Sequence, residues 1–342
     1  MLSLTTAFWP AILGRLIARE DLSDDETGQA MRVILGGEAT PAQVAAFAVA
    51  LRAKGETARE LFGLADAVLE RAPQVKTPGP VVDTSGTGGD GAGTINVSTI
   101  AAFVAAGGGA MVAKLANRAV SSECGSADVL EALGVKVALD PEGVTRCLEE
   151  CGIGFMFAPL FHPALEHAAA ARKEMGVPTV FDFLGPLTNP ARPAAQLVGV
   201  TDERLVPVIA GVLAARRTKG YAVRGTDGTD EITTTGPTEV YEVNAGTFFQ
   251  YHVLPIELGV PVARPEELAG GDPESNARVA RAVLSGERGP ARDIVCVNAG
   301  AALSAAGLTE DIQNGLQLAA ESIDSGKAAR VLDRVIEVSN RV

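Results

Sequence analysis

The chain has 342 residues, 47% of them hydrophobic, which is enough for one large or two ordinary domains with substantial cores. Its formal net charge of −13 and the lack of any Lys/Arg cluster argue against a nucleic-acid-binding protein. We expect no secretory signal, because Pro10, Gly14 and Arg15 break the first apolar stretch. We expect no membrane partner, because the longest uncharged run, 91–113, is rich in Gly, Ser and Thr. Four cysteines without CxxC spacing predict reduced thiols and a cytoplasmic protein.

Residues 1–72 predict a small helical domain of about four helices, the first over 9–20. The patterns SDDE at 23–26 and TARE at 57–60 are typical of capping boxes, in which two side chains satisfy free backbone N–H groups at a helix start. Thr-Pro at 40–41 predicts another start, since proline is favoured at the first helical position.

Residues 73–80 contain three prolines and predict a hinge into a second domain over 81–342. There, apolar β-rich runs alternate with Ala-rich helical ones, which predicts an α/β fold with a mostly parallel sheet flanked by helices. The expected strands include 111–116, 136–139, 221–225 and 293–300, and the expected helices include 127–133, 141–152, 163–175 and 204–217.

Residues 83–99, DTSGTGGDGAGTINVST, predict a phosphate-binding loop, because five glycines fall within eight positions. Glycine permits positive φ and close backbone approach, so successive N–H groups can converge on an anion. Ser98 or Thr99 is expected to cap the next helix and bring its positive end to the same anion. A simple turn is the alternative, but a turn rarely needs five glycines. The segment also matches GxGxxG, yet 92–118 lacks the acidic residue that a dinucleotide site requires.

The run 112–131, VAKLANRAVSSECGSADVLE, is rich in groups that bind phosphate. Lys114 offers a point charge and Arg118 a fork of N–H donors. Hydroxyl groups come from Ser121, Ser122 and Ser126, and Ser126 is expected to cap the helix that follows.

Asp230 and Glu231 lie side by side in a Gly/Thr-rich segment. Such a pair is often a solvated surface feature. Beside a diphosphate-binding loop it suits Mg²⁺, which prefers one or two carboxylates together with substrate phosphates. His162 and His167 are five residues apart, so they do not share a helical face and do not predict a zinc pair.

Several motifs in one order resemble the anthranilate phosphoribosyltransferase family over nearly the whole chain. They are GTGGDG, N-x-S-T, K-x-x-N-R-x-x-S-S-x-x-G-S-A-D-V-L-E-A-L-G, FLGPLTNP at 183–190, the Asp-Glu pair and NAGAAL at 298–303. The pyrimidine nucleoside phosphorylases share the fold but carry different phosphate-loop motifs. The resemblance implies a helical domain that mediates a homodimer and is joined by helices from about 163–190, and an α/β domain that binds phosphoribosyl diphosphate.

The resemblance also implies the reaction, which is Mg²⁺-dependent transfer of the phosphoribosyl group from 5-phosphoribosyl 1-diphosphate to the amine of anthranilate, in tryptophan biosynthesis. An arylamine is mostly uncharged at neutral pH, so no strong general base is implied. The implied donor-binding residues are Gly86, Thr87, Gly88, Gly89, Asp90, Thr94, Asn96, Ser98, Thr99, Lys114, Arg118, Ser121, Ser122 and Ser126. The implied acceptor contacts are Gly86, Leu115, Asn117 and Arg172, and the implied metal ligands are Ser98, Asp230 and Glu231.

The sequence departs from the family pattern in its acceptor half. The usual KHGNR is KLANR at 114–118, so Leu115 and Ala116 replace His and Gly. The usual Arg-Thr and Asn are Pro178-Thr179 and Asp182, and Arg224 replaces a family His. The donor half is intact. A phosphoribosyltransferase for another aromatic acid therefore stays an alternative, as does a non-catalytic phosphate-binding relative, although the latter predicts loss of donor residues too.

Overall fold

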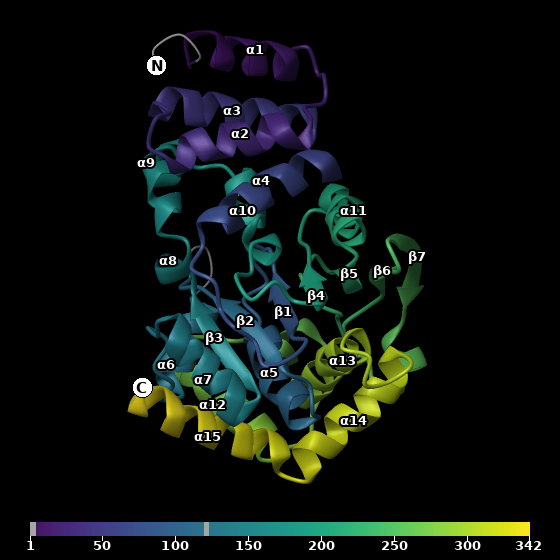
Figure 1. Cartoon of the computed structure of the whole chain (residues 1–342). Helices are drawn as coiled ribbons and strands as arrows, with labels where there is room; N and C mark the ends of the chain where they lie inside the picture. Colours follow the sequence, from purple (N-terminus) through teal and green to yellow (C-terminus); the bar gives the residue numbers. More distant parts are fainter. Residues whose placement is uncertain (1–4, 120–122) are drawn as a thin grey trace. The chain divides into compact units, whose positions relative to one another are not determined.

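The computed structural model describes residues 5–119 and 123–342, which form two compact units (Figure 1). Unit 1 consists of Met1–Ala72 and His162–Thr188, and unit 2 consists of Pro73–Phe161 and Asn189–Val342. The segment 73–80 groups with unit 2 and contains no helix or strand. Ser121 and Ser122, two of the predicted donor contacts, lie outside the described residues.

Unit 1 is helical. Its helices are α1 (Thr5–Ile17), α2 (Asp24–Leu35), α3 (Pro41–Lys54), α4 (Ala58–Arg71), α9 (Glu166–Met175) and α10 (Val180–Phe183), with short 3-10 turns at Pro163–Leu165 and Gly185–Leu187. The predicted capping boxes at Ser23 and Thr57 are confirmed, and Thr40 forms a further one with Gln43. The first helix was predicted over 9–20 but ends at Ile17, because Arg19 adopts a left-handed φ of 60°.

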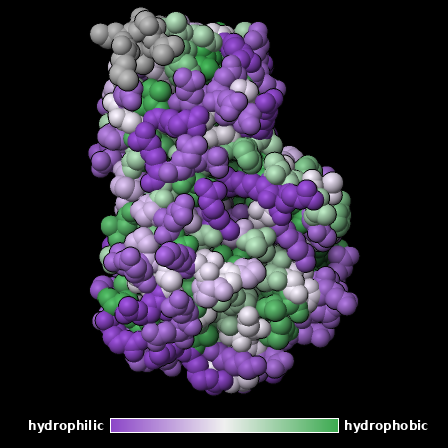
Figure 2. All heavy atoms as spheres, viewed as in Figure 1, coloured by the Kyte–Doolittle hydropathy of each residue, from purple (hydrophilic) through white to green (hydrophobic). Residues whose placement is uncertain are grey.

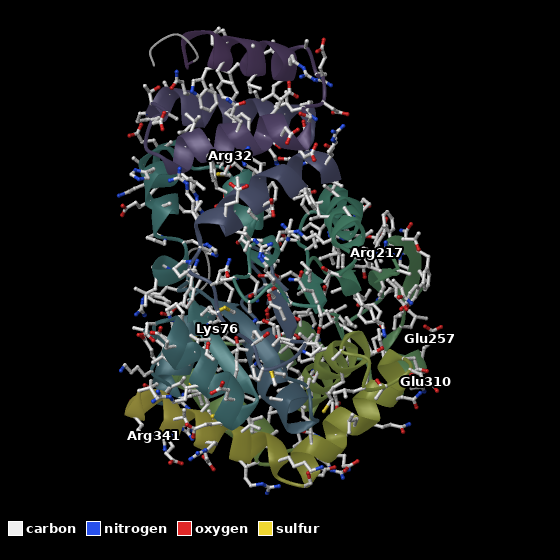
Figure 3. The ribbon with its side chains drawn as sticks, viewed as in Figure 1. Arg32, Lys76, Arg217, Glu257, Glu310 and Arg341 are labelled. Carbon is white, nitrogen blue, oxygen red and sulfur yellow. The ribbon has the colours of Figure 1, made fainter. Side chains whose placement is uncertain are left out.

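A buried carboxylate ties three parts of unit 1 together. Glu60 is fully buried, and its Oε2 accepts hydrogen bonds from the Thr57 N–H at 2.9 Å and from Lys54 Nζ at 3.0 Å. Its Oε1 accepts from the Leu22 N–H at 2.9 Å. One capping residue therefore also joins the end of α3 and the chain before α2, and both carboxylate oxygens are satisfied as burial requires. At the surface, Arg32 of α2 (Figure 3) pairs with Glu70 of α4 at 3.1 Å.

Unit 2 contains a seven-stranded sheet in the order β3-β2-β1-β4-β5-β6-β7. The first five strands in this order are parallel, and β6 and β7 are antiparallel, so the predicted mostly parallel sheet is confirmed. The strands are β1 (Val82–Gly86), β2 (Val112–Ala116), β3 (Ile153–Phe157), β4 (Ala195–Gly199), β5 (Lys219–Gly225), β6 (Thr238–Asn244) and β7 (Thr247–Val253).

The helices of unit 2 are α5 (Val97–Gly107), α6 (Ser126–Ala132), α7 (Pro141–Cys151), α8 (Ala158–Phe161), α11 (Val206–Arg216), α12 (Pro273–Leu284), α13 (Pro290–Ala305), α14 (Ile312–Asp324) and α15 (Lys327–Arg341). Helices α5 and α13 pack on the sheet and on each other, α14 packs on both, and α11 packs on β5 and β6 (Figure 1). Hydrophilic side chains gather over the region of α15 in Figure 2, where Arg341 (Figure 3) pairs with Glu150. None of the helices described is both long and apolar enough to span a membrane.

Two predicted strands are wrong. Residues 293–300 lie in α13, which is buried on all sides, so its apolar run lacks the polar face that marks most helices. Residues 136–139 form no strand, since the Lys136 N–H donates to Ser339 Oγ at 3.1 Å instead of to a neighbouring strand. The segment therefore packs against α15.

The strand order reverses between β1 and β4, because the chain adds β2 and β3 on one side of β1 and continues with β4 and β5 on the other. In open α/β sheets, ligands bind beyond the carboxyl ends of the strands at such a switch point. The last residues of these two strands, Gly86 and Gly199, are register partners. The glycine-rich loop starts here, so the topology and the loop point to the same place.

Gly63 of α4 gives a test of packing in unit 1. A Cβ at Gly63 would lie 2.1 Å from the Asp24 carbonyl oxygen, whereas a Cβ at the exposed Gly14 of α1 would meet nothing within 4 Å. We expect Gly63→Ala to lower the free energy of unfolding by about 1–3 kcal/mol. Gly14→Ala should raise it by about 0.5–1 kcal/mol, since alanine is the better helix former. Urea titration of both variants checks this, and equal effects would contradict the α2–α4 packing.

Candidate donor-binding and metal site

The glycines of the loop after β1 adopt the positive φ angles that the sequence predicts. Gly88, Gly89, Gly91 and Gly93 all have positive φ, between 62° and 78°. Residues that the sequence analysis missed hold the far end of this loop. The Gly270 N–H donates to Gly93 O at 2.7 Å and the Ile95 N–H to Leu268 O at 3.0 Å, and Thr94 forms an isolated antiparallel bridge with Ala269.

The predicted cap of α5 is wrong. The residue at the cap is Asn96, and it makes no side-chain capping bond, while Ser98 and Thr99 lie inside the first turn. The Ser98 N–H instead donates to Glu231 Oε1 at 3.1 Å. A carboxylate more than a hundred residues away thus takes the place of a local cap, and its charge is favourable at the positive end of the helix.

Asp230 fits against the ends of β1 and β4 because both end in glycine. A Cβ at Gly86 would lie 2.1 Å from Asp230 Oδ2, and one at Gly199 would lie 1.5 Å from the Asp230 carbonyl oxygen. Asp230 Oδ2 also accepts the Gly88 N–H at 2.8 Å. The two acidic residues therefore lie directly beside the phosphate-binding loop, as the motif spacing alone could not establish.

Lys114 at the middle of β2 is the cation of the site. Its side chain is buried, and Nζ donates to the Thr84 carbonyl oxygen and to Ser98 Oγ, the latter at 3.3 Å. Burial lowers the pKa of Lys114, and the carboxylates of Asp83, Glu231 and Asp230 oppose that shift. One ammonium group thus faces three buried carboxylates.

The carboxylates have the opposite shift. Burial and the neighbouring Asp230 raise the pKa of Glu231 well above its usual value, and burial and Asp90 raise the pKa of Asp230. Burial also raises the pKa of Asp83, which Lys114 counteracts. Sequence reasoning missed Asp83, although a carboxylate directly after two valines, inside what proves to be β1, was a usable signal.

This excess of buried negative charge fits a cation. Buried atoms without a hydrogen-bond partner lie on the same segments, namely Asp83 Oδ1, Asn96 Oδ1 and Thr99 Oγ1. In 5–119 and 123–342, no group of three or more His, Cys, Asp or Glu residues could hold a metal by itself. Two carboxylates that leave positions for phosphate oxygens are what Mg²⁺ accepts, so the residues fit this ion better than a metal that needs a full protein cage.

The remaining donor candidates of unit 2 are partly engaged. The Thr87 N–H donates to Gly199 O at 2.9 Å, and Asp90 Oδ1 accepts the Ala92 N–H at 3.2 Å. Arg118 is exposed and pairs with Asp128 and Glu131 at 3.0 and 2.8 Å. A donor phosphate would have to compete with two carboxylates for Arg118.

Ser126 does not cap α6, since it is the first residue of the helix and Gly125 occupies the cap. Its Oγ accepts the Asn117 N–H at 2.9 Å and donates to the Asn117 carbonyl at 3.2 Å. Asn117 Oδ1 accepts the Arg118 N–H at 2.9 Å, which orients the side chain of this predicted acceptor contact. Leu115, another acceptor candidate, is half-buried on β2.

Arg172, the last acceptor candidate, lies on α9 of unit 1. Its NH2 group donates to Asp182 Oδ1 at 2.8 Å, while Asp182 Oδ2 accepts the Thr179 N–H at 2.8 Å at the start of α10. The other guanidinium nitrogens of Arg172 make no hydrogen bond or ion pair within the described part of the chain. Asp182, which departs from the family pattern, therefore engages one nitrogen of the Arg172 guanidinium and leaves the other N–H groups for a ligand.

Comparisons with known proteins agree with this fold. Residues 78–329 match the glycosyl transferase family α/β domain, and residues 10–72 match its helical bundle domain. The class of protein is thus a glycosyl transferase built from these two domains. An anthranilate phosphoribosyltransferase from Saccharopolyspora erythraea is 52% identical over 98% of this chain and 97% of its own length. The chain belongs to the anthranilate phosphoribosyltransferase family.

Solved structures also match this chain over nearly its whole length. The anthranilate phosphoribosyltransferase of Thermus thermophilus has a TM-score of 0.91 and 42% identity, covering 96% of this chain and 99% of its own. The enzyme of Saccharomyces cerevisiae in complex with PRPP and Mg has a TM-score of 0.89 and 29% identity, covering 98% and 99% of the two chains. The yeast enzyme has also been solved with 4-fluoroanthranilate. These matches confirm the resemblance and the predicted fold class.

The raised pKa of Glu231 makes a prediction about stability. When the pKa of a carboxyl is higher in the folded than in the unfolded state, the protein becomes less stable as the pH rises above the unfolded pKa, which is 4.5 for this glutamate. In Mg²⁺-free buffer, Glu231→Gln should therefore raise the Tm at pH 7.5 but leave it unchanged near pH 4.5. Each kcal/mol of relieved cost corresponds to about 2–4 °C. Scanning calorimetry across this range checks it, with Glu287→Gln, an exposed site, as control. A gain that does not depend on pH would contradict the buried-charge argument.

Proposed function

We propose that this chain transfers the 5-phosphoribosyl group from 5-phosphoribosyl 1-diphosphate to the amine of anthranilate, giving N-(5-phosphoribosyl)anthranilate and diphosphate in tryptophan biosynthesis. The single observation that carries the proposal is the site at the switch point of the sheet, where Asp230 and Glu231 accept N–H groups of the glycine-rich loop and of α5. The chemistry of this site suits a Mg²⁺-bound diphosphate, and family membership supplies the reaction.

The donor half would act mainly by electrostatics and positioning. Backbone N–H groups of the glycine-rich loop and Lys114 Nζ would face the diphosphate, where negative charge develops as the anomeric C–O bond breaks. Ser98 would hold one Mg²⁺ ion, and Asp230 and Glu231 would hold another; the metal would supply further charge neutralisation of the leaving group. Asn96 and Thr99 would orient the sugar phosphate: Thr99 would donate its unpartnered hydroxyl to the phosphate, and the unpartnered Oδ1 of Asn96 would accept from a ribose hydroxyl.

The acceptor needs little activation. Its neutral amine attacks the anomeric carbon, the C–N bond forms as diphosphate leaves, and the nitrogen then loses one proton to water. Asn117 would contact the amine, and the free guanidinium N–H groups of Arg172 would face the acceptor carboxylate. Holding two reactants in place can supply up to about 7–11 kcal/mol of the barrier reduction.

The wider assignments have separate grounds. A homodimer formed through the helical unit rests on the family resemblance, a hinge at 73–80 rests on the three prolines there, and a cytoplasmic location rests on the cysteine pattern. Donor residues Gly86, Gly89, Thr94, Arg118, Ser121, Ser122 and Ser126, and the acceptor contact Leu115, keep the roles that the motif match assigns them.

The donor half is tested by neutralising its two acids. Asp230→Asn combined with Glu231→Gln should abolish Mg²⁺ dependence and lower turnover by about 10²–10³-fold or more, because the leaving group loses its charge stabilisation. Calorimetric titration with 5-phosphoribosyl 1-diphosphate and Mg²⁺, followed by fluorescence detection of anthranilate consumption, measures both. If Mg²⁺-dependent turnover survives, the metal assignment is wrong. Wild-type donor binding without anthranilate turnover would instead point to another aromatic acid.

The acceptor half is tested at Arg172 and its partner. Arg172→Ala should raise the acceptor KM by about 10–100-fold, the loss of a charged hydrogen bond worth about 1.5–3 kcal/mol, and leave the donor KM nearly unchanged. Asp182→Asn removes a competing negative charge and should lower the acceptor KM by up to about 5-fold, more at low salt. Glu174→Gln, an exposed residue on the same helix, is the matched control. An acceptor KM that Arg172→Ala leaves unchanged would remove Arg172 from the acceptor site.

A further inference from the structure

The motif NAGAAL at 298–303 lies on the buried helix α13. Asn298 is fully buried, and its amide makes three hydrogen bonds. Oδ1 accepts the Ile232 N–H at 3.0 Å, and Nδ2 donates to the Ile232 carbonyl at 2.9 Å and to the Ile294 carbonyl at 2.9 Å. The side chain thus binds both backbone groups of Ile232, as a neighbouring strand would.

Ile232 directly follows the acidic pair, in a segment between β5 and β6 that contains no helix or strand. Such a segment depends on side-chain contacts for its position. Within the segment, the Asp227 carboxylate accepts hydrogen bonds from Thr229 Oγ1 at 2.8 Å and Thr233 Oγ1 at 2.6 Å. Asn298 attaches this segment to α13, one residue from Glu231.

Helix α13 is a firm base for this contact. It crosses α14 at Gly300 and Gly315, where a Cβ on Gly300 would lie 2.5 Å from the Leu316 nitrogen and one on Gly315 would lie 2.2 Å from the Gly300 oxygen. Backbones this close cannot slide past each other without a clash. The two residues of the motif therefore act together. Gly300 fixes the position of α13 against α14, and Asn298 fixes the segment that carries Asp230 and Glu231 against α13.

We propose that Asn298 is a positioning residue for the metal site, which fixes the Glu231 backbone so that the two carboxylates are preorganised for Mg²⁺. The inference rests on the proposed function, because it takes Asp230 and Glu231 as the metal ligands. Residues that orient metal ligands typically contribute about 10–100-fold to metal affinity or activity. Without Asn298, both backbone groups of Ile232 lose their buried partners, and the segment has to reorder whenever the ion binds.

The test compares Asn298→Ala with Ser304→Ala on the same helix. Ser304 is also buried, and its Oγ is 2.8 Å from the hydroxyl of Tyr221 on β5, so its loss removes a buried hydrogen bond elsewhere on α13. Mn²⁺ binding is measured by electron paramagnetic resonance with inorganic diphosphate present, and the Mg²⁺ dependence of turnover is measured on the same preparations. We expect Asn298→Ala to weaken ion binding about 10-fold or more, with kcat recovering at high Mg²⁺. Ser304→Ala should lower the Tm without changing either ion dependence.

Asn298→Asp is the second variant, in case removal of the amide prevents folding. Aspartate has nearly the same size as asparagine and keeps an oxygen that accepts the Ile232 N–H. Its second oxygen replaces Nδ2 and cannot donate to the Ile232 carbonyl when ionised, so weaker ion binding is expected again. Unchanged ion affinity in a folded Asn298 variant, or equal weakening in Ser304→Ala, overturns the inference. A wild-type protein whose turnover needs no divalent ion would contradict the metal assignment itself, so the two failures are distinguishable.

Discussion

The site depends on the burial of three carboxylates, Asp83, Asp230 and Glu231, around a single ammonium group, that of Lys114. Burying like charges together is costly unless a cation or hydrogen bonds compensate. The surrounding structure reduces that cost by offering backbone N–H groups, one to Asp230 from the glycine-rich loop and one to Glu231 from the first turn of α5. The remaining excess of negative charge favours a cation at the site.

Close backbone approach makes this arrangement possible. Gly86 and Gly199 end the two strands at the switch point, and any side chain there would overlap Asp230. The same device is used deeper in the unit, where Gly300 and Gly315 let α13 and α14 touch. The closely packed helices α13 and α14 thus give the segment of Asp230 and Glu231, which contains no helix or strand, a fixed surface to which Asn298 attaches it. A preorganised site of this kind does not need a reactive side chain, because charge placement and positioning do the catalytic task.

Features with local chemistry could be predicted from the sequence, and features that depend on distant partners could not. The capping box at Ser23 and the loop glycines follow from residues within a few positions of one another, and the structure has them. The cap expected at Ser98 is wrong because a carboxylate from the segment between β5 and β6 satisfies that helix start. The strand expected at 293–300 is wrong because a helix buried on every side shows no 3.6-residue alternation of polar and apolar positions. The motifs located the site in the sequence. That Lys114 compensates the charge of Asp83 follows only from the pairing of their strands, which the sequence did not provide.

The two halves of the proposed reaction differ in how tightly their groups are held. The donor groups around Lys114 are buried, so a change there leaves charges without compensation. Arg172 and Asp182 are each about one-third exposed, with side-chain exposures of 31% and 36%. An ion pair this exposed is worth only about 0.2–1 kcal/mol. In the proposed reaction, an acceptor carboxylate would therefore compete with Asp182 for Arg172 at modest cost. The proposed reaction thus implies that variation at Asp182 tunes acceptor affinity, whereas variation around Lys114 disrupts the buried donor groups.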